Sequence, residues 1–258
     1  MHRDKLILAG GSGFLGQILS NWFSERDIDI VILSRTDRQF ENARCVEWDG
    51  KNLGPWAKEL DGATVCIQTG TTTELNLADF FRANNISYQP VPIETNAEAI
   101  QQYTAGACDV YTTDASGLAA SRATFEAPGD HVLLPEIVSK EPLGPLVRHG
   151  DDEWADTVRW TLNALITAEE LGVTSANIGE MSAAAGNNPE INRLLGTEGN
   201  LGEMLGLPAD WAAKAIMASG NYGEIFEKNI GESTPIGLAR GLNAQWTNGG
   251  LLYSPPFR

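Results

Sequence analysis

Short apolar runs alternate with segments of helical spacing over about the first 115 residues. We predict strands at residues 5–9, 29–33, 64–68, 86–93 and 110–113, and helices from residue 14, from residue 75 and across Asn96–Tyr103. This alternation is typical of parallel sheets covered by helices. Over Trp154–Leu171 the apolar residues recur at helical spacing, which predicts a long helix whose apolar side is core rather than binding site. The pattern therefore predicts an α/β fold.

The composition excludes several classes of protein. With 258 residues, of which 42% are hydrophobic, the chain can bury a sizeable core. No stretch approaches the roughly 18 to 20 continuous apolar residues of a membrane-spanning helix, so we expect no membrane insertion. The formal net charge of −16 argues against nucleic acid as a partner.

The charge is spread unevenly along the chain. Residues 1–57 hold 7 Lys and Arg against 8 Asp and Glu, whereas residues 58–258 hold 11 against 26. An asymmetry of this size indicates two parts with different histories.

Cysteine spacing and the first residues bear on metal binding and location. Cys45, Cys66 and Cys108 form no CxxC pair and no ligand cluster, so we expect no metal site. The apolar run Leu6–Ala9 is shorter than the core of a secretory signal peptide, which takes about 7 to 15 residues. We therefore expect the chain as written to stay in the cytoplasm.

The first candidate site is a glycine-rich turn between the first strand and the first helix. In that context the glycines and the helix N-terminus can cradle a pyrophosphate. An arginine at the end of the second strand suits the 2′-phosphate of NADP. The alternative is a turn that serves only packing. The residues predicted to contact the dinucleotide are Gly10, Gly13, Phe14, Leu15, Gly16, Ser34 and Arg35.

Residues 1 to about 60 resemble the opening of the NAD(P)-dependent epimerase/dehydratase-like proteins of the extended short-chain dehydrogenase superfamily. The resemblance rests on the glycine-rich residues 10–16 and on Val31–Arg35 and Val46–Asp49. Catalysis in that family uses a Tyr with a Lys four positions later as general acid or base. None of the five tyrosines is followed by such a lysine. We therefore expect no catalytic residue, no enzyme activity and no required cofactor, although NADP could enter the opening.

The second candidate site lies where two later strands end. Gly70, Thr71 and Thr72 stand between a strand and a helix, where hydroxyls and free N–H groups suit a carboxylate. Asp114 follows another strand and could bind an ammonium group. Together they suit an amino acid. The alternatives are helix capping for the threonines and a solvated turn for Asp114.

Residues 58–258 resemble the periplasmic solute-binding proteins of polar or general L-amino-acid ABC transporters. The resemblance implies two α/β lobes of the type II binding-protein fold that close over an amino acid and do no chemistry. It assigns the α-carboxylate to Gly70, Thr71 and Thr72 and the α-ammonium group to Asp114. In that family a permease is the partner and the location is periplasmic. The motifs are Gln68–Asn76, Cys108–Asp114, Leu134–Ile137, Lys140–Arg148, Leu195–Gly199 and Ala239–Trp246.

The resemblance also places Cys66 and Cys108 on neighbouring strands, which permits a disulfide in an oxidising compartment. In a cytoplasmic chain we expect the pair to stay reduced.

These patterns predict three parts: a Rossmann-like half at 1–59, a second lobe at 60–138, and the C-terminal part of a first lobe at 139–258 that packs with 1–59. In a competing arrangement, strand 64–68 continues the sheet of the opening. Because the opening replaces the family's own N-terminal half, we predict a non-catalytic chimera, recombined or engineered, whose amino-acid binding is weak or lost. The alternatives are an NADP-binding oxidoreductase of the epimerase/dehydratase type and a scaffold that binds nothing well.

Overall fold

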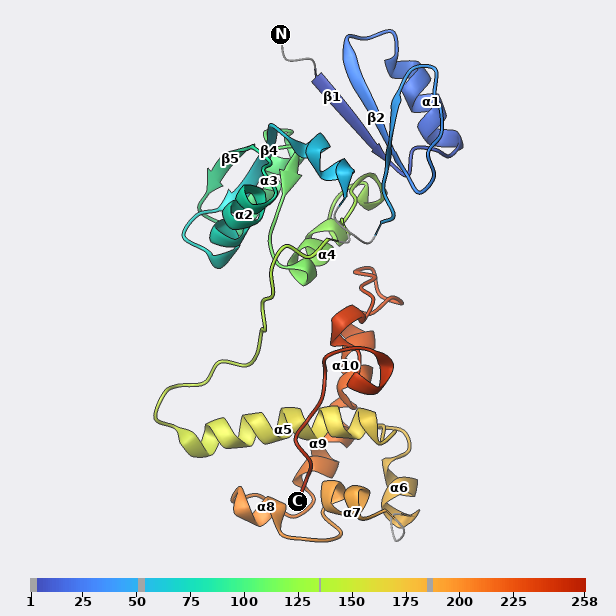
Figure 1. Ribbon diagram of the computed structural model, residues 1–258. Coiled ribbons are helices and arrows are strands. Elements are labelled where there is room, and N and C mark those ends of the chain that lie inside the picture. Colours follow the sequence, from blue (N-terminus) through green and yellow to red (C-terminus); the bar gives the residue numbers. More distant parts are fainter. Residues whose placement is uncertain (1–3, 51–53, 135, 185–187) are drawn as a thin grey trace. The chain divides into compact units, whose positions relative to one another are not determined.

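The computed structural model describes residues 4–50, 54–134, 136–184 and 188–258, which form two compact units, Met1–Glu141 and Pro142–Arg258 (Figure 1). The opening therefore falls in the same unit as residues 60–141. The boundaries predicted after residues 59 and 138, and the packing of 1–59 on 139–258, stay predictions.

The opening forms a three-stranded parallel sheet in the order β1-β2-β3. It consists of β1 (Asp4–Ala9), α1 (Phe14–Phe23), β2 (Ile28–Ser34) and β3 (Arg44–Glu47), followed by the 3₁₀ helix η1 (Pro55–Leu60). The central strand β2 is buried from Ile30 to Ser34, because its apolar run has neighbours on both sides.

A charged cluster ties η1 to this sheet. The Glu59 carboxylate accepts two hydrogen bonds of 2.6 Å from the Arg44 guanidinium on β3 and lies 3.3 Å from Nζ of Lys5 on β1. The hydrogen bonds from Arg44, more than the opposing effect of burial, lower the pKa of Glu59. The carboxylate therefore stays ionised in the folded chain and links three elements.

A second parallel sheet has the order β5-β4-β6. Its elements are β4 (Ala63–Gln68), α2 (Thr72–Ala83), β5 (Tyr88–Ile93), α3 (Asn96–Thr104), β6 (Val110–Tyr111) and α4 (Ala115–Ala123). In the described residues β4 pairs with β5 and β6 and not with β1, so the sheets stay separate. They share an apolar cluster in which Val31 and Leu33 of β2 join Val65 and Ile67 of β4.

A disulfide joins Cys66 of β4 to Cys108, which precedes β6, with the two Cα atoms 5.6 Å apart. We expected this pair to stay reduced, and the structure has it bonded. Both residues are buried beside Ile93 and Ala99. The disulfide therefore fixes the pairing of β4 with β6 inside the core, while Cys45 is free.

The second unit is helical: the described residues after Pro142 contain one isolated β-bridge, between Gln245 and Leu252, and no longer strand. The long helix expected over Trp154–Leu171 is present as α5 (Asp152–Glu170). A core that includes Ala164, Leu194 and Ile216 holds the helices together, and Trp160 packs against it as predicted. The helices of the described residues are α5 (Asp152–Glu170), α6 (Ile178–Ala184), α7 (Pro189–Leu195), α8 (Leu201–Met204), α9 (Trp211–Ser219) and α10 (Tyr222–Asn229). The described 3₁₀ turns after η1 are η2 (Pro128–Asp130), η4 (Gly241–Asn243) and η5 (Trp246–Asn248).

Candidate functional site

The carboxyl edge of the second sheet gathers three strand ends, each followed by the start of a helix. Thr71, Thr95 and Asp114 are the N-caps of α2, α3 and α4. Because β4 pairs with β5 on one side and β6 on the other, the turns after these strands are neighbours. The Gln68 amide donates to the Glu94 carbonyl at 2.9 Å, which joins two of the turns directly.

The turn at Gly70 already holds a carboxylate. The Gly70 N–H donates to the Glu74 side chain at 2.8 Å, and Thr71 Oγ1 accepts a 3.3 Å hydrogen bond from the Glu74 N–H. Gly70 has a φ of +71°, which favours glycine, and a Cβ there would meet no atom within 4 Å. The open turn therefore leaves space over the start of α2.

The same capping pattern recurs at α3, which identifies part of this geometry as local. Thr95 Oγ1 accepts from the Glu98 N–H, and the Glu98 carboxylate accepts from the Glu94 N–H, each at 3.2 Å. Helix capping, which was the alternative reading of Thr71, is thus present. It leaves further N–H groups in the first turn of α2, including that of Thr72, without partners inside the helix.

Asp114 differs from the other two N-caps because its side chain makes no capping hydrogen bond. It is half-buried. Its charge reaches Tyr111 on β6: burial raises the pKa of the Tyr111 hydroxyl, and repulsion from Asp114 adds to that rise. The carboxylate is therefore available to a cation at the carboxyl edge.

The opening carries a separate pocket inside the first unit. Gly10, Ser34 and Arg35, three of the seven residues predicted to contact a dinucleotide, line it. Gly13, Phe14, Leu15 and Gly16 belong to the turn and to α1 but are not part of the lining. The sequence reasoning missed the remaining lining residues, which are Ser12, Leu33, Trp48, Asp49 and Gly50.

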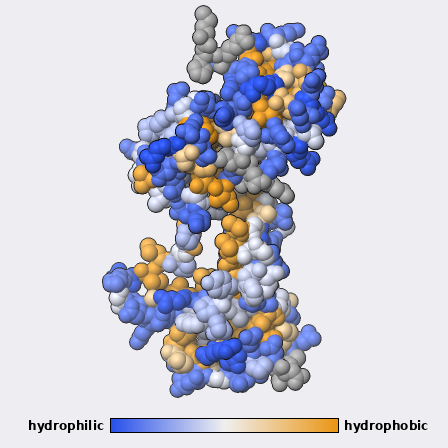
Figure 2. Space-filling view, viewed as in Figure 1, coloured by the Kyte–Doolittle hydropathy of each residue, from blue (hydrophilic) through white to orange (hydrophobic). Residues whose placement is uncertain are grey.

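Close packing explains why residue 16 is a glycine. A Cβ on Gly16 would lie 2.2 Å from the Gly11 carbonyl oxygen, so α1 approaches the turn as closely as a glycine allows. The opposite side of α1 is exposed: the accessible fractions of Phe14, Leu15 and Trp22 are 79%, 72% and 58%. Apolar residues accordingly come to the surface in the part of Figure 2 that corresponds to α1 in Figure 1.

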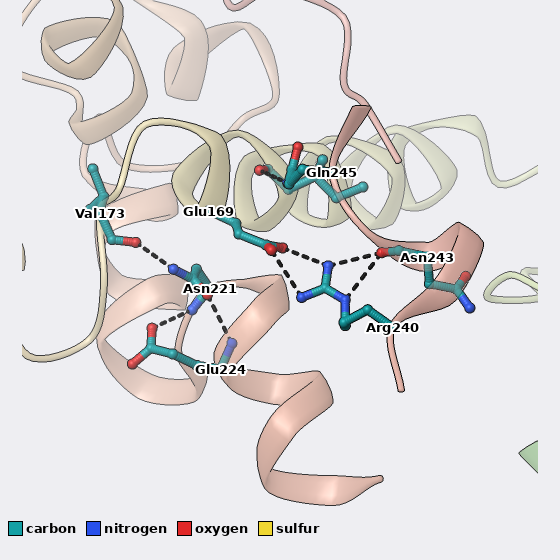
Figure 3. Close-up of polar contacts among 8 residues, drawn as sticks. Glu169, Val173, Asn221, Glu224, Arg240, Asn243 and Gln245 are labelled. Carbon is teal, nitrogen blue, oxygen red and sulfur yellow. Dashed lines mark hydrogen bonds and ion pairs between the residues drawn. The ribbon is translucent and has the colours of Figure 1, made fainter. Parts of the chain in front are cut away.

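A polar network in the second unit fixes the C-terminal segment (Figure 3). The Arg240 guanidinium forms a two-point ion pair with Glu169 of α5, at 2.9 and 3.1 Å, and donates to the Asn243 carbonyl. The buried Gln245 side chain donates to the Ile166 carbonyl at 3.0 Å. These bonds hold the segment on α5, so we assign them a structural role.

The same close-up shows how α10 begins. The Asn221 side chain donates to the Val173 carbonyl at 2.9 Å and accepts from the Glu224 N–H, while the Glu224 carboxylate accepts from the Asn221 N–H (Figure 3). Burial acts to raise the pKa of Glu224, but hydrogen bonds from Ser175 and Asn221 outweigh it and lower that pKa.

Over residues 4–50, 54–134, 136–184 and 188–258, no helix combines the length and apolar character needed to cross a membrane. In the same ranges no three His, Cys, Asp or Glu side chains gather as metal ligands could.

No protein-family model matches the chain. It is 67% identical over 244 residues to the glutamate/glutamine/aspartate/asparagine-binding protein BztA of Rhodobacter capsulatus, and 57% identical over 241 residues to the general L-amino acid-binding periplasmic protein AapJ of Rhizobium johnstonii. Each alignment covers 93% of this chain and 70% of the relative. The chain belongs to the family of amino-acid-binding proteins of ABC transporters. A putative amino-acid ABC transporter-binding protein of Escherichia coli, YhdW, is 45% identical over 239 residues.

A comparison with solved structures supports the same family assignment. The chain matches an ABC transporter periplasmic binding protein from Brucella ovis with glutathione bound, with a TM-score of 0.73 and 56% identity. The match covers 78% of this chain and 63% of that protein, so the chain spans a little under two thirds of its length. Binding proteins of this family are not enzymes and need no cofactor, which confirms the expectation of a non-enzyme.

The comparisons overturn the predicted function. We expected a chimera with weak or lost binding, and an NADP-binding oxidoreductase as the alternative. Residues 58–258 are 201 of the 258 residues, or 78%, yet the alignments cover 93% of the chain, so the likeness to amino-acid-binding proteins extends into the opening. The glycine-rich strand, turn and helix misled us because α/β proteins of many functions use that arrangement. The expected cytoplasmic location also lacks support, because AapJ is a periplasmic protein.

Proposed function

We propose that the chain binds a polar L-amino acid and delivers it to the permease of an ABC transporter. The relatives support the ligand class, since BztA is a glutamate/glutamine/aspartate/asparagine-binding protein and AapJ is a general L-amino acid-binding protein. The observation that carries the proposal is that the Gly70 turn and Asp114 follow β4 and β6, which pair directly. Open α/β sheets bind ligands at this carboxyl edge.

The two halves of an amino acid have separate partners in this arrangement. The α-carboxylate meets Gly70, Thr71 and Thr72, where N–H groups at the start of α2 and the helix dipole favour negative charge. The α-ammonium group meets Asp114, whose carboxylate has no capping duty. The Gly70 N–H donates to the Glu74 carboxylate, so a bound amino acid has to displace Glu74 from this donor.

Calorimetric titration of the whole chain with L-glutamate, L-glutamine and L-alanine tests the proposal. A charged hydrogen bond contributes about 1.5 to 3 kcal/mol, so Asp114→Asn should weaken binding of every ligand roughly 10- to 150-fold. The control is Asp79→Asn, which removes the same charge from an exposed ion pair with Arg82 on α2. The proposal fails if no ligand binds, or if Asp79→Asn weakens binding as much as Asp114→Asn.

We further propose that the pocket of the opening can hold a phosphate-bearing ribonucleotide such as NADP, without any reaction. The specific observation in its favour is that Arg35, Trp48 and the glycine-rich turn line one pocket. A guanidinium suits a phosphate and an indole suits a base. Gly10 and Gly13 belong to the turn, and Phe14, Leu15 and Gly16 begin α1. Ser34 contributes its position beside Arg35, its hydroxyl being engaged by the Thr36 N–H at 3.3 Å.

Titration with NADP and NAD tests this second proposal. Arg35→Ala should weaken NADP more than NAD, because only NADP carries the 2′-phosphate. Arg38→Ala is the control, an exposed arginine three positions away and outside the pocket lining. Absence of binding by both nucleotides, or an equal loss for both in Arg35→Ala, would refute it.

A further inference from the structure

Asn96 lies at the same carboxyl edge as the proposed amino-acid site. It is the first residue of α3, directly after the turn that follows β5. That turn is bonded to the neighbouring one: the Thr69 N–H donates to the Ile93 carbonyl at 2.9 Å, and the Gln68 amide donates to the Glu94 carbonyl. Asn96 therefore begins α3 directly after the turn that neighbours the Gly70 turn, and its side chain is exposed.

Tyr111 sets the orientation of the Asn96 amide. Its hydroxyl donates a hydrogen bond to Asn96 Oδ1. The ring is partly buried and packs near Tyr103, with the two ring centroids 6.4 Å apart, and Tyr103 itself bonds His131 at 3.0 Å. With its oxygen engaged from beneath α3, the amide has its Nδ2 donors left for another partner.

The position of Tyr111 also links Asn96 to the ammonium side of the site. Asp114 follows Tyr111 by three residues at the end of β6, and its negative charge contributes to the raised pKa of the Tyr111 hydroxyl. One tyrosine thus stands between the residue proposed for the α-ammonium group and a side-chain amide with free donors.

We infer that Asn96 Nδ2 donates to a side-chain oxygen of the bound amino acid, and that Tyr111 is the positioning residue that aims it. This inference rests on the proposed function and names its ligand class: amino acids whose side chain ends in a carboxylate or a carboxamide. An aliphatic ligand side chain offers no acceptor, so the Asn96 amide would remain hydrogen-bonded to water. A neutral hydrogen bond should favour L-glutamine over L-alanine roughly 2- to 12-fold, and a charged one should favour L-glutamate roughly 10- to 150-fold.

The experiment is calorimetric titration of the whole chain and its variants with L-glutamate, L-glutamine and L-alanine. Asn96→Ala should remove the preference for the two oxygen-bearing ligands and leave L-alanine within about twofold. Asn96→Asp should weaken L-glutamate more than L-glutamine, because it opposes two carboxylates. Gln101→Ala, which removes an exposed amide from the same helix, is the control and should leave all three affinities unchanged.

Tyr111→Phe separates aiming from folding. It keeps the ring and removes the hydroxyl, so it should lower the ratio of L-glutamate to L-alanine affinity while L-alanine binding persists. The inference is overturned if Asn96→Ala weakens L-alanine as much as L-glutamate, or changes neither. It falls together with the proposed function if the wild-type chain binds none of the three, whereas L-alanine binding that depends on Asp114 but ratios that ignore Asn96 would refute this inference alone.

Discussion

Breaking the Cys66–Cys108 disulfide should destabilise the first unit and leave the second unchanged. The two cysteines are 42 residues apart in sequence, and the loop that they close contains α2, β5 and α3. In the chain-entropy model, closing a loop of that length stabilises the folded state by about 4 kcal/mol at 25 °C. Reduction should therefore remove about 4 kcal/mol, and with a urea m-value of about 2 kcal/mol/M the unfolding midpoint should fall by about 2 M.

Hydrogen exchange in urea measures the two units separately. Amides of β4 report on the first unit, and amides of α5 and α9 report on the second. The comparison is wild-type chain with and without dithiothreitol, which breaks the bond without changing any residue. Cys45→Ser is the control, because Cys45 is free and its loss should shift neither unit.

Two results would refute the reasoning. If reduction leaves the β4 midpoint within about 0.3 M of its oxidised value, the loop does not stabilise the sheet. If amides of α5 lose protection to the same extent as those of β4, the effect of reduction is not confined to the unit that contains the bond.

Three further substitutions have predicted effects on stability. Gly16→Ala should cost about 1 to 3 kcal/mol of unfolding free energy, since its Cβ would overlap the turn, whereas Gly13→Ala, with no atom within 4 Å of its Cβ, should cost much less; equal thermal shifts would contradict this. Because the folded pKa of Glu59 lies below its ordinary 4.5, the stabilisation it provides is present above pH 4.5 and is lost as the pH falls through the folded value. Glu59→Gln should therefore weaken the loss of stability at acid pH, measured by hydrogen exchange of the β2 amides. Arg240→Gln should destabilise the second unit by about 2 to 3 kcal/mol, because the partly buried Glu169 carboxylate loses its cationic partner, and restoration of stability by Glu169→Gln would confirm the coupling.

The sequence predicted the local elements well where the apolar pattern was strong. The strand at residues 64–68, the turn after it and the helix across 96–103 appear as β4, the Gly70 turn and α3. Their residues dictate this locally: an apolar run has to be buried on both faces, and Thr71 and Thr95 each have a Glu three positions later that completes a cap. The expectation that Gly70 and Asp114 stand at strand ends follows from the same patterns.

The function of the opening could not be read from its local pattern. The strand, glycine turn and helix do form, but that arrangement is shared by proteins of many functions, so it did not identify a dehydrogenase-like half. The likeness to amino-acid-binding proteins, which extends beyond residues 58–258, decided the family instead.

The sequence by itself determined which segments become strands and helices, because periodicity, glycine turns and caps act over a few residues. The local patterns left open which strand ends meet, and only the family resemblance placed the strands of Cys66 and Cys108 side by side. Only the order β5-β4-β6 brings the turn at Asn96 beside that at Gly70 and sets Tyr111 beneath α3, where its hydroxyl reaches the Asn96 amide. Pairing of strands depends on contacts between residues far apart in the chain, and no local pattern encodes that order.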